Sequence, residues 1–313
     1  MQWKNKRIIV TGGAGVIGKE LIKKLTEKGA IINCFDIAPR PKVFSEKVEY
    51  CQKDLSLLNP IEFISFDPEI IFHLAATFER TKEDKNFWEL NYLNNIILSH
   101  KVINVAKECK NFKKFLFASS YLIYDPTLYL FKRYPQKPIK LKEEDKINPR
   151  NLCGAAKYYT EKELEFLSDF EEYSFSSVLA RIFRAYGRGS RDVISRWIRA
   201  GLEGEEIEVF LEKNSFDYIF AEDVAEGLIR LGENNFQGVV NLGSGRSQSI
   251  EEVVNTIKKY IPQIKIKKIQ KRDLFEASCA DISKLKQVAN WRPSATLEEG
   301  IKKIIEYEAK KKN

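Results

Sequence analysis

Apolar runs and amphipathic stretches alternate along the first half of the chain. Short runs rich in Ile, Val, Leu and Phe predict buried strands at residues 7–10, 30–35, 69–74, 115–119 and 175–180. Longer stretches with helical spacing predict a helix that ends near Leu25 and further helices at residues 88–109 and 155–170. Strands and helices that alternate in this way predict a parallel sheet with helices on both faces.

The pattern changes after Arg181. Helices are expected at residues 193–203, 221–231 and after Thr296, and a strand at residues 207–210. We expect these pieces to form a smaller lobe over the carboxyl ends of the strands, where open α/β sheets bind ligands. The predicted fold is α/β, a Rossmann-type doubly wound parallel sheet with a smaller C-terminal α/β substrate-binding lobe. The dinucleotide-binding domain is expected at residues 1–183 and 217–249, and the second lobe at 184–216 and 250–313.

A glycine-rich turn follows the first strand. Gly12, Gly15 and Gly18 allow a tight turn, a close approach of the backbone to a pyrophosphate and close packing of a helix on the strand. The second strand ends in Asp36, eighteen residues past Gly18, where a carboxylate accepts hydrogen bonds from an adenosine ribose. Because this carboxylate repels a 2′-phosphate, the predicted cofactor is NAD rather than NADP.

Composition narrows the class of protein. Of 313 residues, 43% are hydrophobic and 31% charged, as in a soluble globular protein. No apolar run approaches the roughly 18 residues of a membrane span, and no signal peptide precedes the first strand, so we expect a cytoplasmic protein that binds no membrane. The five scattered cysteines predict neither a disulfide framework nor a metal site. The net charge of +8 is spread along the chain, which favours a solvated surface over nucleic-acid binding.

Several further segments, in order, match those of one protein family. They are residues 11–18, Asp36, 54–55, 73–76, Asn91, 117–124, Lys157, 180–183, 186–187, 217–224, 241–245, 291–293 and 297–300. With these segments the chain resembles the extended short-chain dehydrogenase/reductases, in particular the NAD-dependent nucleotide-sugar epimerases, dehydratases and dehydrogenases.

The resemblance implies a set of site residues. The cofactor would be held by Gly12, Gly15, Val16, Ile17, Gly18, Asp36, Asp54, Leu55, Leu74, Ala75, Ala76, Asn91 and Lys157. Ser120 would hydrogen-bond the sugar hydroxyl that is oxidised, and Ser119 and Tyr121 would contact the sugar. His73, at a buried strand end, is expected to be a packing or hydrogen-bonding group.

The chain departs from the family at the catalytic base. Four positions before Lys157 the family has a tyrosine, and this chain has Cys153. The pKa of a thiol is low enough for its thiolate to serve as the base. The sulfur of a cysteine, however, lies roughly 3.5 Å nearer the backbone than the oxygen of a phenol, judged from bond lengths. Three possibilities stay open: Cys153 acts directly or through water, Tyr121 or Tyr124 replaces it, or the protein binds its ligand without turnover.

The reaction expected from the resemblance is oxidation at C4. Dehydratases of the family carry an Asp-Glu pair where this chain has Tyr121 and Leu122. Because an epimerase needs a well-placed phenol for proton return, we expect a 4-dehydrogenase that makes a 4-keto sugar. A GDP-heptose 4-dehydrogenase of bacterial capsule synthesis is one enzyme of this type. The alternatives are a 4-epimerase and a catalytically weak nucleotide-sugar-binding protein.

Arginines are expected to bind the substrate diphosphate. Arg184 stands where the family commonly has an asparagine, and Phe216 where it usually has an arginine. We therefore expect Arg184, Arg188, Arg191 and Arg272 to hold a GDP-, UDP- or dTDP-linked sugar. The helices at 88–109 and 155–170 correspond to those that form the dimer interface of relatives, so a homodimer is expected.

Overall fold

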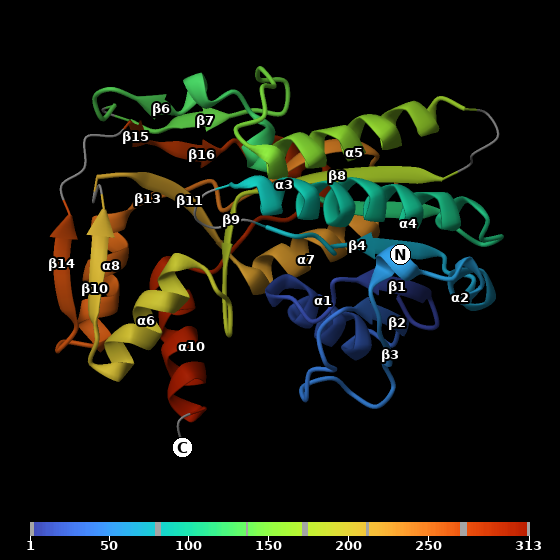
Figure 1. The fold of residues 1–313 in the computed structure, drawn as a ribbon, viewed down its shortest axis with the longest axis horizontal. Helices are drawn as coiled ribbons and strands as arrows, with labels where there is room; N and C mark the ends of the chain where they lie inside the picture. Colours follow the sequence, from blue (N-terminus) through green and yellow to red (C-terminus); the bar gives the residue numbers. More distant parts are fainter. Residues whose placement is uncertain are drawn as a thin grey trace.

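A seven-stranded parallel sheet forms the centre of the molecule (Figure 1). The computed structural model describes residues 3–78, 83–135, 137–170, 175–210, 213–269 and 274–311. In spatial order the strands are β12 (Gly238–Leu242), β8 (Ser176–Ile182), β5 (Lys114–Ser120), β4 (Ile70–His73), β1 (Arg7–Thr11), β2 (Ile31–Asp36) and β3 (Glu49–Gln52). The chain runs outward from β1 to β3 and then crosses to β4, so the order reverses between β1 and β4, where α/β sheets bind ligands. The predicted Rossmann-type fold is confirmed.

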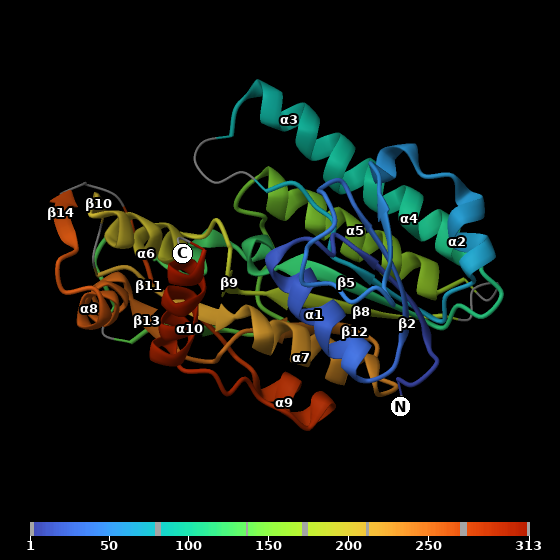
Figure 2. The same ribbon diagram turned by 90° about the horizontal axis from the view of Figure 1, so that it is seen from below.

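Helices cover both faces of this sheet (Figure 2). One face carries α1 (Val16–Glu27), α7 (Ala221–Gly232) and α9 (Ser283–Ala289), and the other carries α2 (Pro60–Phe66), α3 (Lys85–Asn91), α4 (Leu98–Lys107) and α5 (Leu152–Ser168). Successive strand residues point to opposite faces, so Ile8 and Val10 join the core beneath α1, whereas Ile9 joins the core beneath α4.

The expected helix at residues 88–109 is wrong in detail. The helical segment starts earlier, with α3 at Lys85, passes through a π-helix at Tyr92–Ile97 and ends with α4 at Lys107. The pattern of apolar residues does not distinguish α from π geometry. In the π-helix two neighbouring side chains, Asn94 and Asn95, both hydrogen-bond Thr77.

The start of α5 also differs from the expected one. It begins at Leu152 rather than at Ala155, because Asn151 caps it: the side-chain oxygen of Asn151 accepts a hydrogen bond from Gly154 N at 2.9 Å. Cys153 therefore lies in the first turn of this helix.

A smaller lobe lies beyond the carboxyl ends of the central strands (Figure 1). Its helices are α6 (Val193–Glu203), α8 (Ile250–Tyr260) and α10 (Leu297–Lys310), and its strands are β9 (Arg184–Tyr186), β10 (Glu206–Phe210), β11 (Ser215–Phe220), β13 (Ser247–Ser249) and β14 (Lys265–Ile269). They enclose a separate apolar core. Two further strand pairs join β6 (Leu130–Phe131) to β15 (Phe275–Glu276) and β7 (Ile139–Leu141) to β16 (Ser278–Ala280). The exact domain boundaries stay a prediction.

Among the described segments, no helix is both long enough and apolar enough to cross a membrane.

Candidate functional site

The glycine loop leaves no room for side chains at two of its positions. Gly12 has φ +73°, and a Cβ there would lie 2.6 Å from Ala75 N. A Cβ on Gly18 would lie 2.5 Å from Gly12 O, so α1 can pack against the loop only with glycine at this place. The N-cap of α1 is Gly15, which offers no side-chain cap. The first backbone N–H groups of α1 are thus left for an anion.

Asp36, at the end of β2, lies beside this loop. Its Oδ2 accepts a hydrogen bond from Ala14 N at 2.8 Å, and its Oδ1 accepts one from Ala38 N at 2.9 Å. These bonds fix the carboxylate at the mouth of the β1–β2 crevice, where a ribose diol could donate to its remaining lone pairs.

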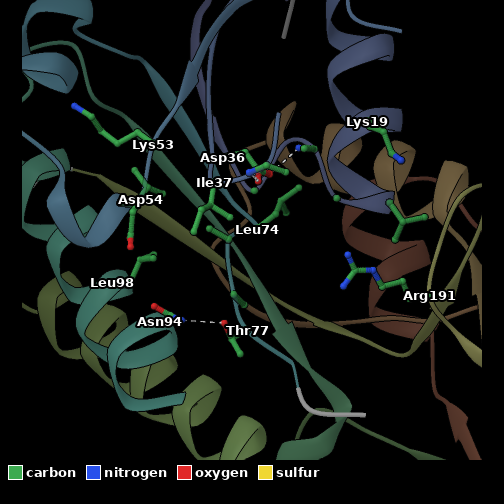
Figure 3. Close-up of a pocket in the computed structure, with 18 of the residues that line it drawn as sticks. Lys19, Asp36, Ile37, Lys53, Asp54, Leu74, Thr77, Asn94, Leu98 and Arg191 are labelled. Carbon is green, nitrogen blue, oxygen red and sulfur yellow. Dashed lines mark hydrogen bonds between the residues drawn. The ribbon is translucent and has the colours of Figure 1, made fainter. Parts of the chain in front are cut away.

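A cavity of about 490 Å³ joins these elements (Figure 3). The predicted residues that line it are Gly12, Gly15, Val16, Asp36, Asp54, Leu55, Leu74, Ala75, Ala76 and Arg191. In Figure 3, Lys53 and Asp54 lie at one end of the cavity and Lys19 and Arg191 at the other. Three features of the cavity fit a dinucleotide such as NAD: the uncapped start of α1, the fixed carboxylate of Asp36, and a glycine loop whose close packing leaves no room for a Cβ.

Four predicted cofactor residues do not line this cavity: Ile17, Gly18, Asn91 and Lys157. Ile17 packs against the core and Gly18 against the glycine loop. Asn91 is 4% exposed, and its Nδ2 donates to Leu152 O at 3.2 Å. Asn91 thus connects the long helical segment to the start of α5, next to Cys153.

The predicted catalytic residues come from β5 and α5. Ser120 ends β5, and its Oγ accepts from Leu122 N at 3.2 Å. A Cβ on Gly154 would lie 2.5 Å from Leu122 O, so the first turn of α5 packs tightly on the segment that follows Ser120. Cys153, in that turn, is 4% exposed, and its thiol donates toward Thr77 O with Sγ at 3.7 Å.

Lys157 lies one helical turn after Cys153. Its Nζ lies 4.6 Å from the centre of the Phe117 ring. Burial lowers the pKa of the Lys157 ammonium to about 8, and the opposing effects of Cys153 and Glu161 are smaller. A proton on this amine is therefore held less tightly than on an ordinary lysine.

The two tyrosines considered as alternative bases are buried. Tyr124 is completely buried, and its hydroxyl donates to Asn241 Oδ1 at 2.6 Å. The Tyr121 hydroxyl donates to Glu276 Oε1 at 3.2 Å. Burial raises the pKa of both phenols above their ordinary value. Both hydroxyls thus face protein acceptors.

The predicted substrate residues are not all in one place. Ser119 is 4% exposed, and its hydroxyl donates to Glu161 Oε1. Arg188 forms ion pairs through Nη2 with Glu20 at 2.7 Å and with Glu222 at 2.6 Å. Arg272 lies outside the described residues.

Arg184 and Arg191 occupy different surroundings. Arg184 forms an ion pair with Glu276 and lies over the ring of Phe216, 3.8 Å from its centre. Arg191 lines the dinucleotide cavity together with Gly189 and Ser190.

Thr77 and the two asparagines that hydrogen-bond it were not predicted as site residues. Thr77 lines the cavity, and its backbone is held by Asn95, which accepts from Thr77 N at 2.7 Å and donates to Thr77 O at 2.8 Å. Asn94 donates to Thr77 Oγ1 at 3.2 Å. The sequence does contain an indication of these contacts. Asn91, Asn94 and Asn95 lie within five residues of a predicted helix, and amide side chains that a helix buries need hydrogen-bond partners.

The chain matches known proteins over most of its length. The model of the NAD dependent epimerase/dehydratase family matches residues 8–243. The chain is 25% identical to the dTDP-4-dehydro-6-deoxyglucose reductase of Escherichia coli, over 97% of this chain and 98% of the reductase. It is 29% identical to UDP-glucuronic acid decarboxylase 6 of Arabidopsis thaliana, over 95% of this chain and 87% of the decarboxylase. The crystal structure of UDP-glucose 4-epimerase from Thermotoga maritima, with UDP-glucose, matches with a TM-score of 0.82 and 26% identity, over 98% of this chain and 99% of the epimerase chain.

Proposed function

Since this chain belongs to the NAD-dependent epimerase/dehydratase family and is an NAD-dependent enzyme, we propose that it oxidises C4 of a nucleotide-diphosphate sugar and releases a 4-keto sugar. The observation that carries the proposal is the buried thiol of Cys153, which donates toward Thr77 O. From the resemblance in sequence, we assign Cys153 to the position of the family's tyrosine. Epimerisation requires a proton donor that reaches the ketone as it is reduced again. The ketone must first turn so that hydride returns to its other face, and a short, buried thiol is less able than a phenol to reach the oxygen in its new position, so oxidation without return is favoured.

Each catalytic residue has one task in this proposal. NAD, when bound, supplies the acceptor for the hydride that leaves C4. Ser120 Oγ hydrogen-bonds the C4 hydroxyl and orients it. The thiolate of Cys153 takes the hydroxyl proton, directly or through one bridging water. Lys157 Nζ, one turn away on α5, places a positive charge near this sulfur.

Other reactions of the family lack their proton carriers here. Dehydration needs an acid and a base in the positions of Tyr121 and Leu122, and the Tyr121 hydroxyl donates instead to Glu276. Tyr124 donates to Asn241. These contacts support Cys153 over either tyrosine as the base.

We also propose that the sugar substrate is linked to GDP, UDP or dTDP and that the reaction belongs to bacterial surface-polysaccharide synthesis.

We propose further that the protein forms a homodimer. Large apolar side chains are exposed on α3 and on α5, which pack side by side: Trp88 is 62% exposed and Phe166 65%. A second copy of this pair of helices would cover them.

Purified protein incubated with NAD and a panel of UDP-, GDP-, dTDP- and CDP-sugars tests the reaction. The expected result is a rise in nicotinamide absorbance with one nucleotide family, and a product two mass units lighter than the substrate. A product of unchanged mass with inverted C4 would identify an epimerase instead. Binding without any product would identify a non-catalytic binder.

A further inference from the structure

Arg150, Arg184 and Glu276 form a buried ion-pair cluster beside the proposed reacting centre. Glu276 Oε2 accepts from Arg150 Nη1 at 2.5 Å and from Arg184 Nη2 at 3.3 Å. Because one carboxylate oxygen contacts both guanidiniums, the two arginines are close neighbours. Oε1 of the same carboxylate accepts from Tyr121 and from Ser278, each at 3.2 Å.

The cluster keeps one uncompensated positive charge. Burial alone would raise the pKa of the Glu276 carboxyl, but Arg184 and Arg150 hold it below its ordinary value, so the carboxylate is ionised at neutral pH. Arginine does not lose its proton in proteins. One negative group thus faces two positive ones.

Exposure differs sharply within the cluster. The Glu276 side chain is only 3% exposed, whereas that of Arg150 is 33% exposed and that of Arg184 is 35% exposed. Cζ of Arg184 lies over the ring of Phe216, 3.8 Å from its centre, and a guanidinium in such a contact keeps its N–H groups available for hydrogen bonds. Arg184 donates to Glu276 through Nη2. Among the described residues, no hydrogen-bond partner is found for its Nη1.

The cluster adjoins the catalytic residues along the chain and in space. Tyr121, which donates to Glu276, directly follows Ser120. Arg150 lies three residues before Cys153, and its backbone N donates to Leu122 O at 2.8 Å. Tyr121 and Arg150, which both contact Glu276, therefore belong to the same two segments as Ser120 and Cys153.

We infer that Arg150 and Arg184, held side by side by Glu276, form a binding site for an oxyanion of the substrate. Two guanidiniums with free N–H edges match the geometry of a phosphate or a carboxylate. The oxyanion is either the phosphate linked to the sugar or a carboxylate carried by the sugar. This inference rests on the proposed function, and it adds Arg150 and Glu276 to the substrate site.

Calorimetric titration in the presence of NADH, which prevents oxidation, tests the site. The probes are UDP, UDP-glucose and UDP-glucuronic acid, with the corresponding GDP, GDP-mannose and GDP-mannuronic acid and dTDP, dTDP-glucose and dTDP-glucuronic acid. The variants are Arg150→Gln and Arg184→Gln. The control is Arg230→Gln, which removes an arginine of α7 that is 44% exposed and pairs with Glu226 and Glu233.

If the site binds the phosphate, both variants weaken the neutral and the acidic sugar nucleotide alike, by roughly tenfold or more. If it binds a carboxylate, they weaken only the acidic sugar nucleotide by this factor. In either case NADH affinity and the control variant match wild type. Equal affinities of wild type and both variants for every probe would overturn the inference and leave the proposed function standing. If wild type binds none of the probes, the proposed function falls, and the inference with it.

Discussion

His73 shows how burial fixes the protonation state of one side chain. Its ring is fully buried, with Thr11 Oγ1 2.7 Å from Nδ1 and Ser99 Oγ 3.0 Å from Nε2. The ring stacks on Phe117. These contacts confirm that His73 is a packing and hydrogen-bonding group. Burial lowers the pKa of the ring to about 3, and Lys157 acts in the same direction.

His73 should make the fold sensitive to acid. Between pH 6.5 and 3 the unfolded chain binds a proton at this residue and the folded protein does not, so the free energy of unfolding falls as the pH falls through this range. From pH 6.5 to pH 5 the loss due to His73 is about 2 kcal/mol. Urea unfolding at both pH values measures it. His73→Gln should remove this part of the pH dependence, whereas His100→Gln, at an exposed position, should retain it. Equal pH dependence in His73→Gln and wild type would contradict the prediction.

Cys153 carries the proposed chemistry, and its removal should affect the rate alone. Cys153→Ala should lower kcat by ~10²–10⁴-fold, because a general base is lost. The affinity for NAD should not change, since Cys153 does not line the dinucleotide cavity. Steady-state kinetics and fluorescence titration with NADH measure the two quantities. Full activity of Cys153→Ala would exclude the thiol as the base. Cys153→Tyr completes the series: a faster enzyme would show that reach limits the wild type.

Local chemistry explains which elements could be predicted from the sequence. The glycine loop, Asp36 and the central strands depend on residues close together in the chain, and the structure has them where the sequence indicates. The Arg150–Glu276 ion pair joins residues 126 positions apart, and no local pattern marks it. The π-helix likewise hydrogen-bonds Thr77, which lies in the segment after β4, so its contacts too are not marked by a local pattern. The roles of the individual site residues stay predictions.

Asn95 of the π-helix should contribute both to stability and to NAD binding. This residue is 3% exposed and hydrogen-bonds both the N–H and the carbonyl of Thr77. Asn95→Ala removes both of these hydrogen bonds and leaves the Thr77 N–H without its partner, so it should lower the free energy of unfolding by about 1–3 kcal/mol. NAD binding should also weaken, because Thr77 lines the cavity. Asn94→Ala, which removes only the bond to Thr77 Oγ1, should cost less. Denaturant titration of both variants provides the comparison, and equal losses would argue against the prediction.

At the scale of the whole molecule, one loop of the smaller lobe packs against the domain of the central sheet. Residues 187–192 follow β9 and lie against the start of α1: a Cβ on Gly187 would approach Val16 Cγ2 to 3.0 Å. Arg188 pairs with Glu20 on α1 and with Glu222 on α7, and Glu222 also pairs with Lys303 on α10. This chain of ion pairs connects helices of both lobes.

The proposed homodimer can be tested on its exposed apolar side chains. The double variant Trp88→Glu/Phe166→Glu places charge on both helices and should give a monomer of 36.3 kDa in sedimentation velocity, where wild type should sediment as a dimer. Val43→Glu is the matched control, because Val43 is 71% exposed but lies on the loop between β2 and β3. A wild type that sediments as a monomer at micromolar concentration would contradict the proposal.

The loop that carries Arg191 also has a consequence for the lifetime of the bound cofactor. Gly189, Ser190 and Arg191 wall the dinucleotide cavity from the side of the smaller lobe. Bound NAD would contact this wall, and Arg188, its neighbour, is anchored to Glu20 and Glu222. We expect release of the reduced cofactor past this anchored loop to be slower than hydride transfer, so that with excess NAD the first turnover is faster than those that follow.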